Sequence, residues 1–295
     1  MAKKKYEESN IQAIAETIRS KTGTEKTYDS SEMASGVNEV YDKGRTDGQD
    51  DFWAKYQAKG EVPFGYSIAT YMFAGARWND ETFFPKYNIN LNGAPQDVFI
   101  WNSCTNLKQR LEDCGVRIMS TSSGGITSLA HIFKYTKTTE LPPIYNVSPN
   151  KLSMLRFCDG ATNLIKVPYY DFFHRVTDFT MAFANCSSLV EVEGIDFSSA
   201  TVLTNIFYQC GKLTTITVYG TIPISISFSS CPLSVESMKS IVLHLKNYAG
   251  TSNAGAYTLT LKDECKTTMA NLGAIPELNN KTYDAYLTDI GWNLA

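Results

Sequence analysis

The stretch MAFANCSSLVEV (residues 181–192) is followed 24 positions later by NIFYQCGKLTTI (205–216), and both carry the same hydrophobic pattern. Each contains a phenylalanine, a cysteine three residues later and a leucine three residues after that. Looser copies on both sides have an aromatic or apolar residue first, a small residue second and usually a leucine third. The six copies are Trp101, Cys104 and Leu107; Tyr135, Thr138 and Leu141; Cys158, Ala161 and Leu164; Phe183, Cys186 and Leu189; Phe207, Cys210 and Leu213; and Phe228, Cys231 and Ser234.

The spacing of these copies predicts a repetitive fold. Their middle residues are 34, 23, 25, 24 and 21 positions apart, and a period of about 20–30 residues with recurring leucines is typical of a solenoid. One coil cannot bury its own apolar side, so coils stack and equivalent residues form ladders in the interior. We therefore predict that the copies are buried and that their cysteines are small core residues rather than metal ligands or nucleophiles. The step of 34 predicts an inserted loop around residues 110–125.

The two best copies resemble the BspA-like leucine-rich repeats of bacterial surface proteins, and the resemblance extends over roughly residues 95–235. It implies an α/β fold, a leucine-rich-repeat solenoid of short parallel strands with a module at each end. The flanks, including IQAIAETIRSKTG (11–23) and the ending DIGWNLA (289–295), look like segments common in prophage-encoded proteins of gut Firmicutes. Such proteins are usually assigned to phage tails or to bacterial surfaces.

Two modules flank the predicted solenoid, which we place at residues 61–233. In residues 1–60, apolar residues at helical spacing (Ile11, Ile14 and Ile18) predict a helical anchoring or oligomerisation segment. Short amphipathic helices cannot bury such a stripe alone, so we expect them to dock on the next domain, on copies of the chain (as in a trimer) or on another protein. Residues 234–295 predict an α/β cap with a helix from Ser234, a strand over 257–261 and a final strand near 291–294.

Composition and motifs argue against several classes of function. The net charge is −3 and charged residues make up 19%, so there is no basic field for nucleic acid or an anionic membrane. No apolar run approaches the roughly 18 residues that span a bilayer, and no apolar stretch of a secretory signal follows the basic start. Three histidines and seven cysteines lack metal-ligand spacing, and no catalytic motif is present. We expect no enzyme activity, metal or cofactor, although a pair of glycan-cleaving carboxylates leaves no trace in sequence spacing.

Aromatic residues outside the repeat pattern are the candidates for a binding surface, because aromatic side chains are common anchors at interfaces. The segment PYYDFFH (168–174) is the better candidate, since its bulky residues cannot easily all face inward. The alternative is that half or more of these rings pack inside the fold. The candidates are Tyr169, Tyr170, Phe172 and Phe173 in that segment, and Trp78, Phe83, Phe84 and Tyr87 in a second one.

Together these features predict a non-enzymatic binding protein. We expect a tail-fibre-like or receptor-binding component of a phage or prophage virion that recognises a bacterial cell-surface receptor, either protein or glycan. The alternatives are a bacterial surface adhesin of the same repeat family, a purely architectural protein that contacts other virion proteins only, and a glycan-cleaving enzyme on a phage tail.

Overall fold

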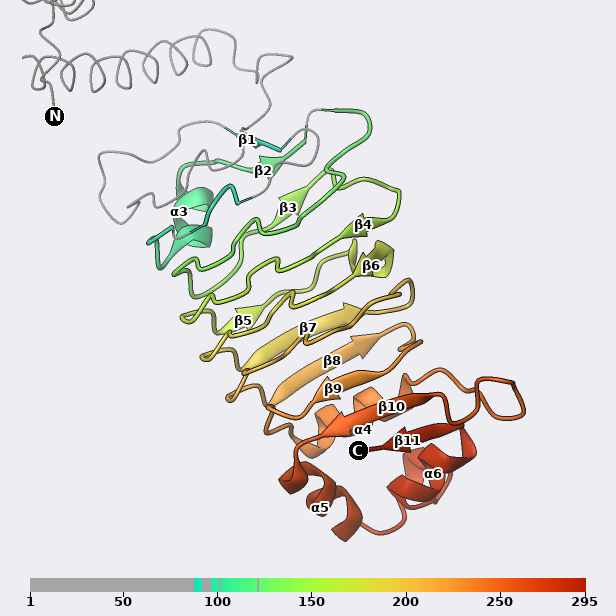
Figure 1. The fold of residues 1–295 in the computed structure, drawn as a ribbon. Coiled ribbons are helices and arrows are strands. Elements are labelled where there is room, and N and C mark those ends of the chain that lie inside the picture. Colours follow the sequence, from blue (N-terminus) through green and yellow to red (C-terminus); the bar gives the residue numbers. More distant parts are fainter. Residues whose placement is uncertain (1–87, 92–96, 101, 121) are drawn as a thin grey trace, which may run out of the picture. The chain divides into compact units, whose positions relative to one another are not determined.

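The computed structural model describes residues 88–91, 97–100, 102–120 and 122–295, all of which belong to one compact unit, Phe64–Ala295 (Figure 1). The predicted helical segment over residues 1–60 lies outside the described residues. The same is true of Trp78, Phe83, Phe84, Tyr87 and Trp101. What the sequence predicts for these residues stays a prediction.

The described chain is a mixed α/β structure built from short parallel strands (Figure 1). The first sheet contains β1 (Ile89–Asn90), β2 (Ile118–Met119) and β3 (Ile144–Tyr145), and a second pairs β4 (Leu152–Ser153) with β6 (Val176–Asp178). The third contains β5 (Lys166–Val167), β7 (Glu191–Asp196) and β8 (Thr215–Tyr219), and the fourth β9 (Ile226–Phe228), β10 (Tyr257–Leu261) and β11 (Trp292–Leu294). All pairings between these strands are parallel, so each connection returns the chain to the same end of its sheet.

Short helices accompany these sheets. They are α3 (Leu107–Asp113), α4 (Val235–Leu243), α5 (Asp263–Asn271) and α6 (Tyr283–Asp289), with 3₁₀ turns η2 (Phe173–Arg175) and η3 (Pro276–Leu278). As predicted, α4 starts after Ser234, whose hydroxyl accepts a hydrogen bond from the Ser237 N–H (3.2 Å). The two strands predicted near the C-terminal end are β10 and β11. Within the described part of the chain, no helix is long and apolar enough to cross a membrane.

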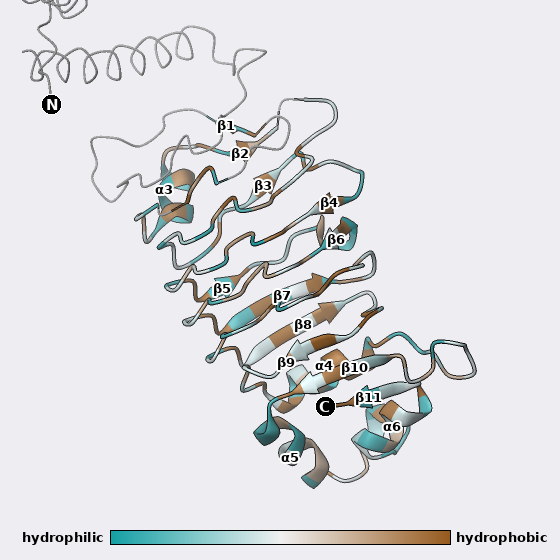
Figure 2. Cartoon of the chain, in the orientation of Figure 1, coloured by the Kyte–Doolittle hydropathy of each residue, from teal (hydrophilic) through white to brown (hydrophobic). Residues whose placement is uncertain are grey.

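Neighbouring strands of the third sheet are one repeat apart in the sequence. Lys166, Glu191 and Thr215 are in register across β5, β7 and β8. Backbone hydrogen bonds continue between the turns outside the strands, as where the Cys158 N–H donates to the Ala182 carbonyl (2.9 Å). Successive repeats therefore lie side by side. In Figure 2, β7 carries both hydrophilic and hydrophobic residues, and β8 carries pale and hydrophobic ones. Exposed and buried residues alternate along β8, as in a strand with one buried and one exposed face.

The residues of the repeat pattern form a continuous interior. The buried ones are Cys104, Leu107, Thr138, Leu141, Cys158, Ala161, Leu164, Phe183, Cys186, Leu189, Phe207, Cys210, Leu213, Phe228 and Cys231. The Phe207 ring stacks between those of Phe183 and Phe228, with centroids 5.6 and 5.4 Å apart. Stacked rings of this kind bury a large apolar area and couple each repeat to the next.

The buried cysteines also satisfy backbone groups of the preceding repeat. The Cys186 thiol donates to the Cys158 carbonyl (3.3 Å), and the Cys210 thiol donates to the Phe183 carbonyl (3.1 Å). Burial raises the pKa of the Cys186, Cys210 and Cys231 thiols, which disfavours the thiolate that a nucleophile or metal ligand requires. Among the described residues, no group of three or more His, Cys, Asp or Glu side chains is arranged to hold a metal ion.

The expectation of an inserted loop over residues 110–125 is wrong in part. This range contains the second half of α3, strand β2 and a turn that ends at Gly125. Leu107 and Leu111 lie one helical turn apart and are both buried, and this pair holds the helix in the core. Only these two apolar residues mark so short a helix in the sequence.

The position assigned to Tyr135 in the second copy is also wrong. Phe133 occupies the core instead, and its ring centroid lies 5.1 Å from that of Phe99 and 5.3 Å from that of Phe157. Tyr135 is half-buried and its ring covers Gly160, where an added Cβ would clash with it. In the second repeat the core aromatic Phe133 precedes the small buried Thr138 by five positions, whereas Phe183 precedes Cys186 by three. A search with one fixed spacing therefore misses Phe133.

Candidate binding surface on the β5–β7–β8 sheet

Three of the four aromatic rings in the segment 168–174 are buried, which corrects the expectation that they form an exposed patch. Tyr170 is only 5% exposed, and Phe172 and Phe173 are fully buried. The chain turns through η2, so that consecutive rings pack on one another: Tyr170 stacks on Phe172 with centroids 4.8 Å apart. The Tyr170 hydroxyl donates to the Pro142 carbonyl (2.7 Å). These three side chains are therefore core residues, and of the four candidates only Tyr169 is exposed.

Two tyrosines from different repeats meet on the exposed side of the third sheet. Tyr169 follows β5 by two residues, Tyr219 ends β8, and they are 53% and 55% exposed. Their ring centroids are 5.7 Å apart and the ring planes are inclined by 59°. Sequence reasoning missed Tyr219, although it lies 50 positions after Tyr169, which is two repeats. A search for aromatic residues at the repeat period outside the core pattern would have found the pair.

Gly194 of β7 lies between the two tyrosines. A Cβ at this position would lie 2.8 Å from ring atoms of both Tyr169 and Tyr219, and the φ of +56° also disfavours a side chain. Gly194 sits where the register between β7 and β8 shifts, and its N–H donates to the Thr217 hydroxyl (2.7 Å). The missing side chain therefore lets the two rings meet over β7. We call Tyr169, Gly194 and Tyr219 the tyrosine platform.

Three charged residues share the exposed side of this sheet, because the residues that alternate with them, such as Val167 and Val192, are buried. The Lys166 Nζ lies 2.6 Å from the Glu193 Oε1 and 3.4 Å from the Glu191 Oε2. The hydrogen bond to Glu193, followed by that to Glu191, raises the pKa of Lys166 and keeps it charged. We call Lys166, Glu191 and Glu193 the charged cluster. One ammonium between two carboxylates leaves an excess of one negative charge and several hydrogen-bonding oxygens.

The outer edge of β8 is closed by side chains of α4. The Ile216 N–H donates to the Ser237 hydroxyl (2.9 Å), and the Val218 N–H donates to the Ser240 hydroxyl (3.1 Å). Strand β7 pairs on both sides, with β5 and with β8. These backbone groups are therefore occupied, and the sheet presents its side chains rather than a free strand edge.

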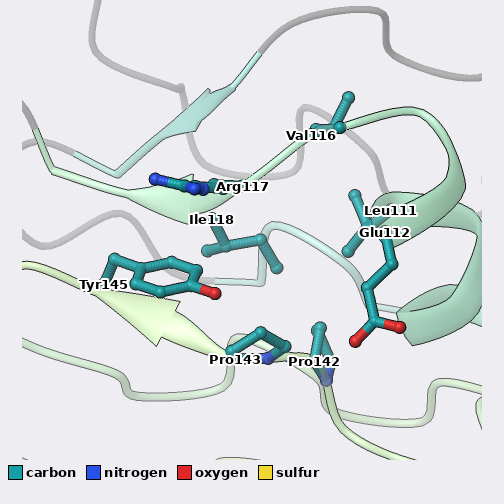
Figure 3. A pocket seen from close by; sticks show the side chains of 9 residues that line it. Leu111, Glu112, Val116, Arg117, Ile118, Pro142, Pro143 and Tyr145 are labelled. Atoms are coloured by element: carbon teal, nitrogen blue, oxygen red, sulfur yellow. The ribbon is translucent and has the colours of Figure 1, made fainter.

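A hollow of about 270 Å³ lies on other elements, between α3, β2 and β3 (Figure 3). It is lined by Leu111, Glu112, Gly115, Val116, Arg117, Ile118, Pro142, Pro143 and Tyr145. The Arg117 guanidinium lies over the Tyr145 ring, 5.3 Å from its centroid. No lining residue belongs to the tyrosine platform, so the hollow and the platform are separate features.

A comparison of the chain with models of known protein families, with curated proteins and with solved structures found no match.

Proposed function

We propose that this chain is a non-enzymatic binding protein whose repeat region is a BspA-like leucine-rich-repeat solenoid with a C-terminal α/β cap. The parallel pairing of neighbouring repeats and their buried ladder support the solenoid, because stacked coils produce both. The α4 hydroxyls that accept hydrogen bonds from β8 support the capping role, since they occupy an edge that would otherwise recruit another strand.

The proposed role is recognition of a bacterial surface by a tail-fibre-like or receptor-binding component of a phage or prophage particle. The tyrosine platform carries this proposal, because half-exposed tyrosine rings combine apolar area with a polar hydroxyl and are common anchors of binding surfaces. Many copies on one particle would turn weak single contacts into strong attachment. A trimer formed through residues 1–60 would supply part of that multiplicity.

The test is a pull-down of the purified full chain with intact cells and isolated cell walls from a panel of Gram-positive gut bacteria. The platform variant carries Tyr169→Ser and Tyr219→Ser. The matched control carries Tyr208→Ser, which removes a tyrosine that is 47% exposed but lies in a turn outside the strands. Circular dichroism and thermal melts establish that both variants are folded.

Saturable binding to a narrow set of strains, weakened in the platform variant and kept in the control, is the expected result. Folded wild-type protein that binds no strain would refute surface recognition and favour the architectural role, with the platform facing a neighbour in the particle. Equal binding by all three proteins would place recognition elsewhere on the chain.

A further inference from the structure

The tyrosine platform and the charged cluster offer two kinds of contact on one exposed sheet face. The ring faces of Tyr169 and Tyr219 can stack against flat apolar groups, such as the C–H face of a sugar ring. The carboxylates of Glu191 and Glu193 can accept hydrogen bonds from neighbouring hydroxyl groups, and Lys166 can donate one. A molecule with a flat C–H face and a rim of hydroxyls uses both.

The charge of this face disfavours an anionic ligand, because the charged cluster holds two carboxylates and one ammonium. The only cation of the charged cluster is already held by two carboxylates, at 2.6 and 3.4 Å. Binding of nucleic acid or of an anionic polymer depends on cations that are free to contact phosphate or carboxylate groups. The cluster instead offers acceptor oxygens, which suit hydroxyl donors that carry no charge.

The backbone of this sheet disfavours an extended peptide as the ligand. A peptide that adds a strand needs a free strand edge for its main-chain hydrogen bonds. Strand β7 is paired on both sides, and the Ile216 and Val218 N–H groups of β8 already donate to Ser237 and Ser240. Recognition here depends on side chains alone.

The shape of the platform favours a chain over a small molecule. Tyr219 ends β8 and Tyr169 follows β5, and β7 lies between these two strands. The pair lies on the exposed face of a sheet, and none of its residues lines the hollow of Figure 3. A ligand on such a surface gains contact by extending along the stacked strands.

We propose that the tyrosine platform binds a neutral polysaccharide of the bacterial surface, with sugar rings stacked on Tyr169 and Tyr219 and sugar hydroxyls bonded to the charged cluster. This inference rests on the proposed function and names the chemical class of its receptor. Gly194 is a positioning residue in this site, because its missing side chain lets the two rings meet.

The experiment uses the full chain and the strains that it binds in the pull-down. One aliquot of cells is oxidised with periodate and reduced with borohydride, which destroys the vicinal diols of sugars. A second is treated with a broad-specificity protease, and a third with buffer. Polysaccharide released from the same walls serves as a soluble competitor. Four proteins are compared: wild type, the double variants Tyr169→Phe/Tyr219→Phe and Tyr169→Ala/Tyr219→Ala, and the Tyr208→Ala control.

The proposal expects periodate to abolish binding and the released polysaccharide to compete for it. The double phenylalanine variant keeps the ring faces and should bind within about threefold of wild type, whereas the double alanine variant should lose about tenfold per ring. The Tyr208→Ala control should bind like wild type.

Binding that survives periodate and disappears after protease would overturn the polysaccharide proposal while leaving surface recognition intact. Periodate-sensitive binding that is unchanged in the double alanine variant would overturn the assignment of the site. Failure of the wild-type chain to bind any strain is a different result, because it refutes the proposed function itself.

Discussion

Two aromatic-rich regions of this molecule behave in opposite ways. Tyr170, Phe172 and Phe173 are close neighbours in the sequence, and all three are buried. Tyr169 and Tyr219 are 50 positions apart, yet their rings meet on an exposed face. The side of the strand or turn that a residue occupies decides its exposure, and the local density of aromatic residues does not.

The largest expected effect tests the buried region. Phe172→Ala removes a fully buried ring that stacks on Tyr170, so we expect the free energy of unfolding to fall by about 3–5 kcal/mol. Urea unfolding followed by circular dichroism measures this loss. Tyr169→Ala, three positions away and exposed, is the matched control and should cost less than about 1 kcal/mol. Equal losses of unfolding free energy in the two variants would mean that the exposed Tyr169 stabilises the fold as much as the buried Phe172 does.

A smaller effect tests whether the serines of α4 close the outer edge of β8. The Ser237 hydroxyl accepts from the Ile216 N–H and donates to the Thr214 carbonyl, both at 2.9 Å. Ser237→Ala leaves a buried N–H without its partner, so we expect a loss of about 1–3 kcal/mol and faster hydrogen exchange at the Ile216 amide. Ser240→Ala serves as the comparison because its bond to the Val218 N–H is longer, at 3.1 Å. Unchanged exchange at Ile216 would show that the serine does not close this edge.

The next effect tests the geometry of the tyrosine platform. Gly194→Ala adds a Cβ at 2.8 Å from both rings to a residue with φ of +56°, so we expect a loss of about 1–2 kcal/mol. Combining it with Tyr219→Ala removes one of the two clashes and should recover part of the loss in a double-mutant cycle. Strictly additive losses, measured by urea unfolding, would mean that the glycine does not position the rings.

The smallest expected effect on stability concerns the exposed tyrosines themselves. Tyr169→Ser with Tyr219→Ser removes a cross-strand ring pair, which contributes about 0.2–1 kcal/mol. Binding to cells should nevertheless fall about tenfold or more, because exposed anchors contribute to the complex rather than to the fold. A large drop in melting temperature, with binding unchanged at low temperature, would mean that the two tyrosines stabilise the fold, as the buried rings do, and do not contribute to binding.

Much of the repeat interior could be predicted from the sequence, because the spacing of Phe183, Cys186 and Leu189 recurs in Phe207, Cys210 and Leu213. Helix α4 was predictable from Ser234 and the apolar face behind it, and β10 from its alternation. The second repeat was misassigned because two additional residues move Tyr135 out of the core and Phe133 into it. Helix α3 was missed because only Leu107 and Leu111 mark it.

The conformation of the tight turns in the repeats could not be predicted from the sequence either. Met181 and Asn205 have φ values of +52° and +54°, and Asn185 and Gln209 have +58° and +59°, so these two repeats each hold two left-handed residues at matching positions. Asparagine tolerates this conformation better than most residues, but methionine and glutamine give no hint of it. The stacking of neighbouring repeats imposes these conformations, which local preference alone would not select.

By itself, the sequence determined most of the residues that form the ladder and the helix and strands after it, because burial within the regular repeats follows from short, constant spacings along the chain. Only the tertiary structure decided that Tyr169 and Tyr219 meet over Gly194 and that their aromatic neighbours do not reach solvent. Contacts across strands depend on register, and here register depends on a shift between β7 and β8 and on serines from α4. Those are relations between residues far apart in the chain, so they exist only once the repeats have stacked.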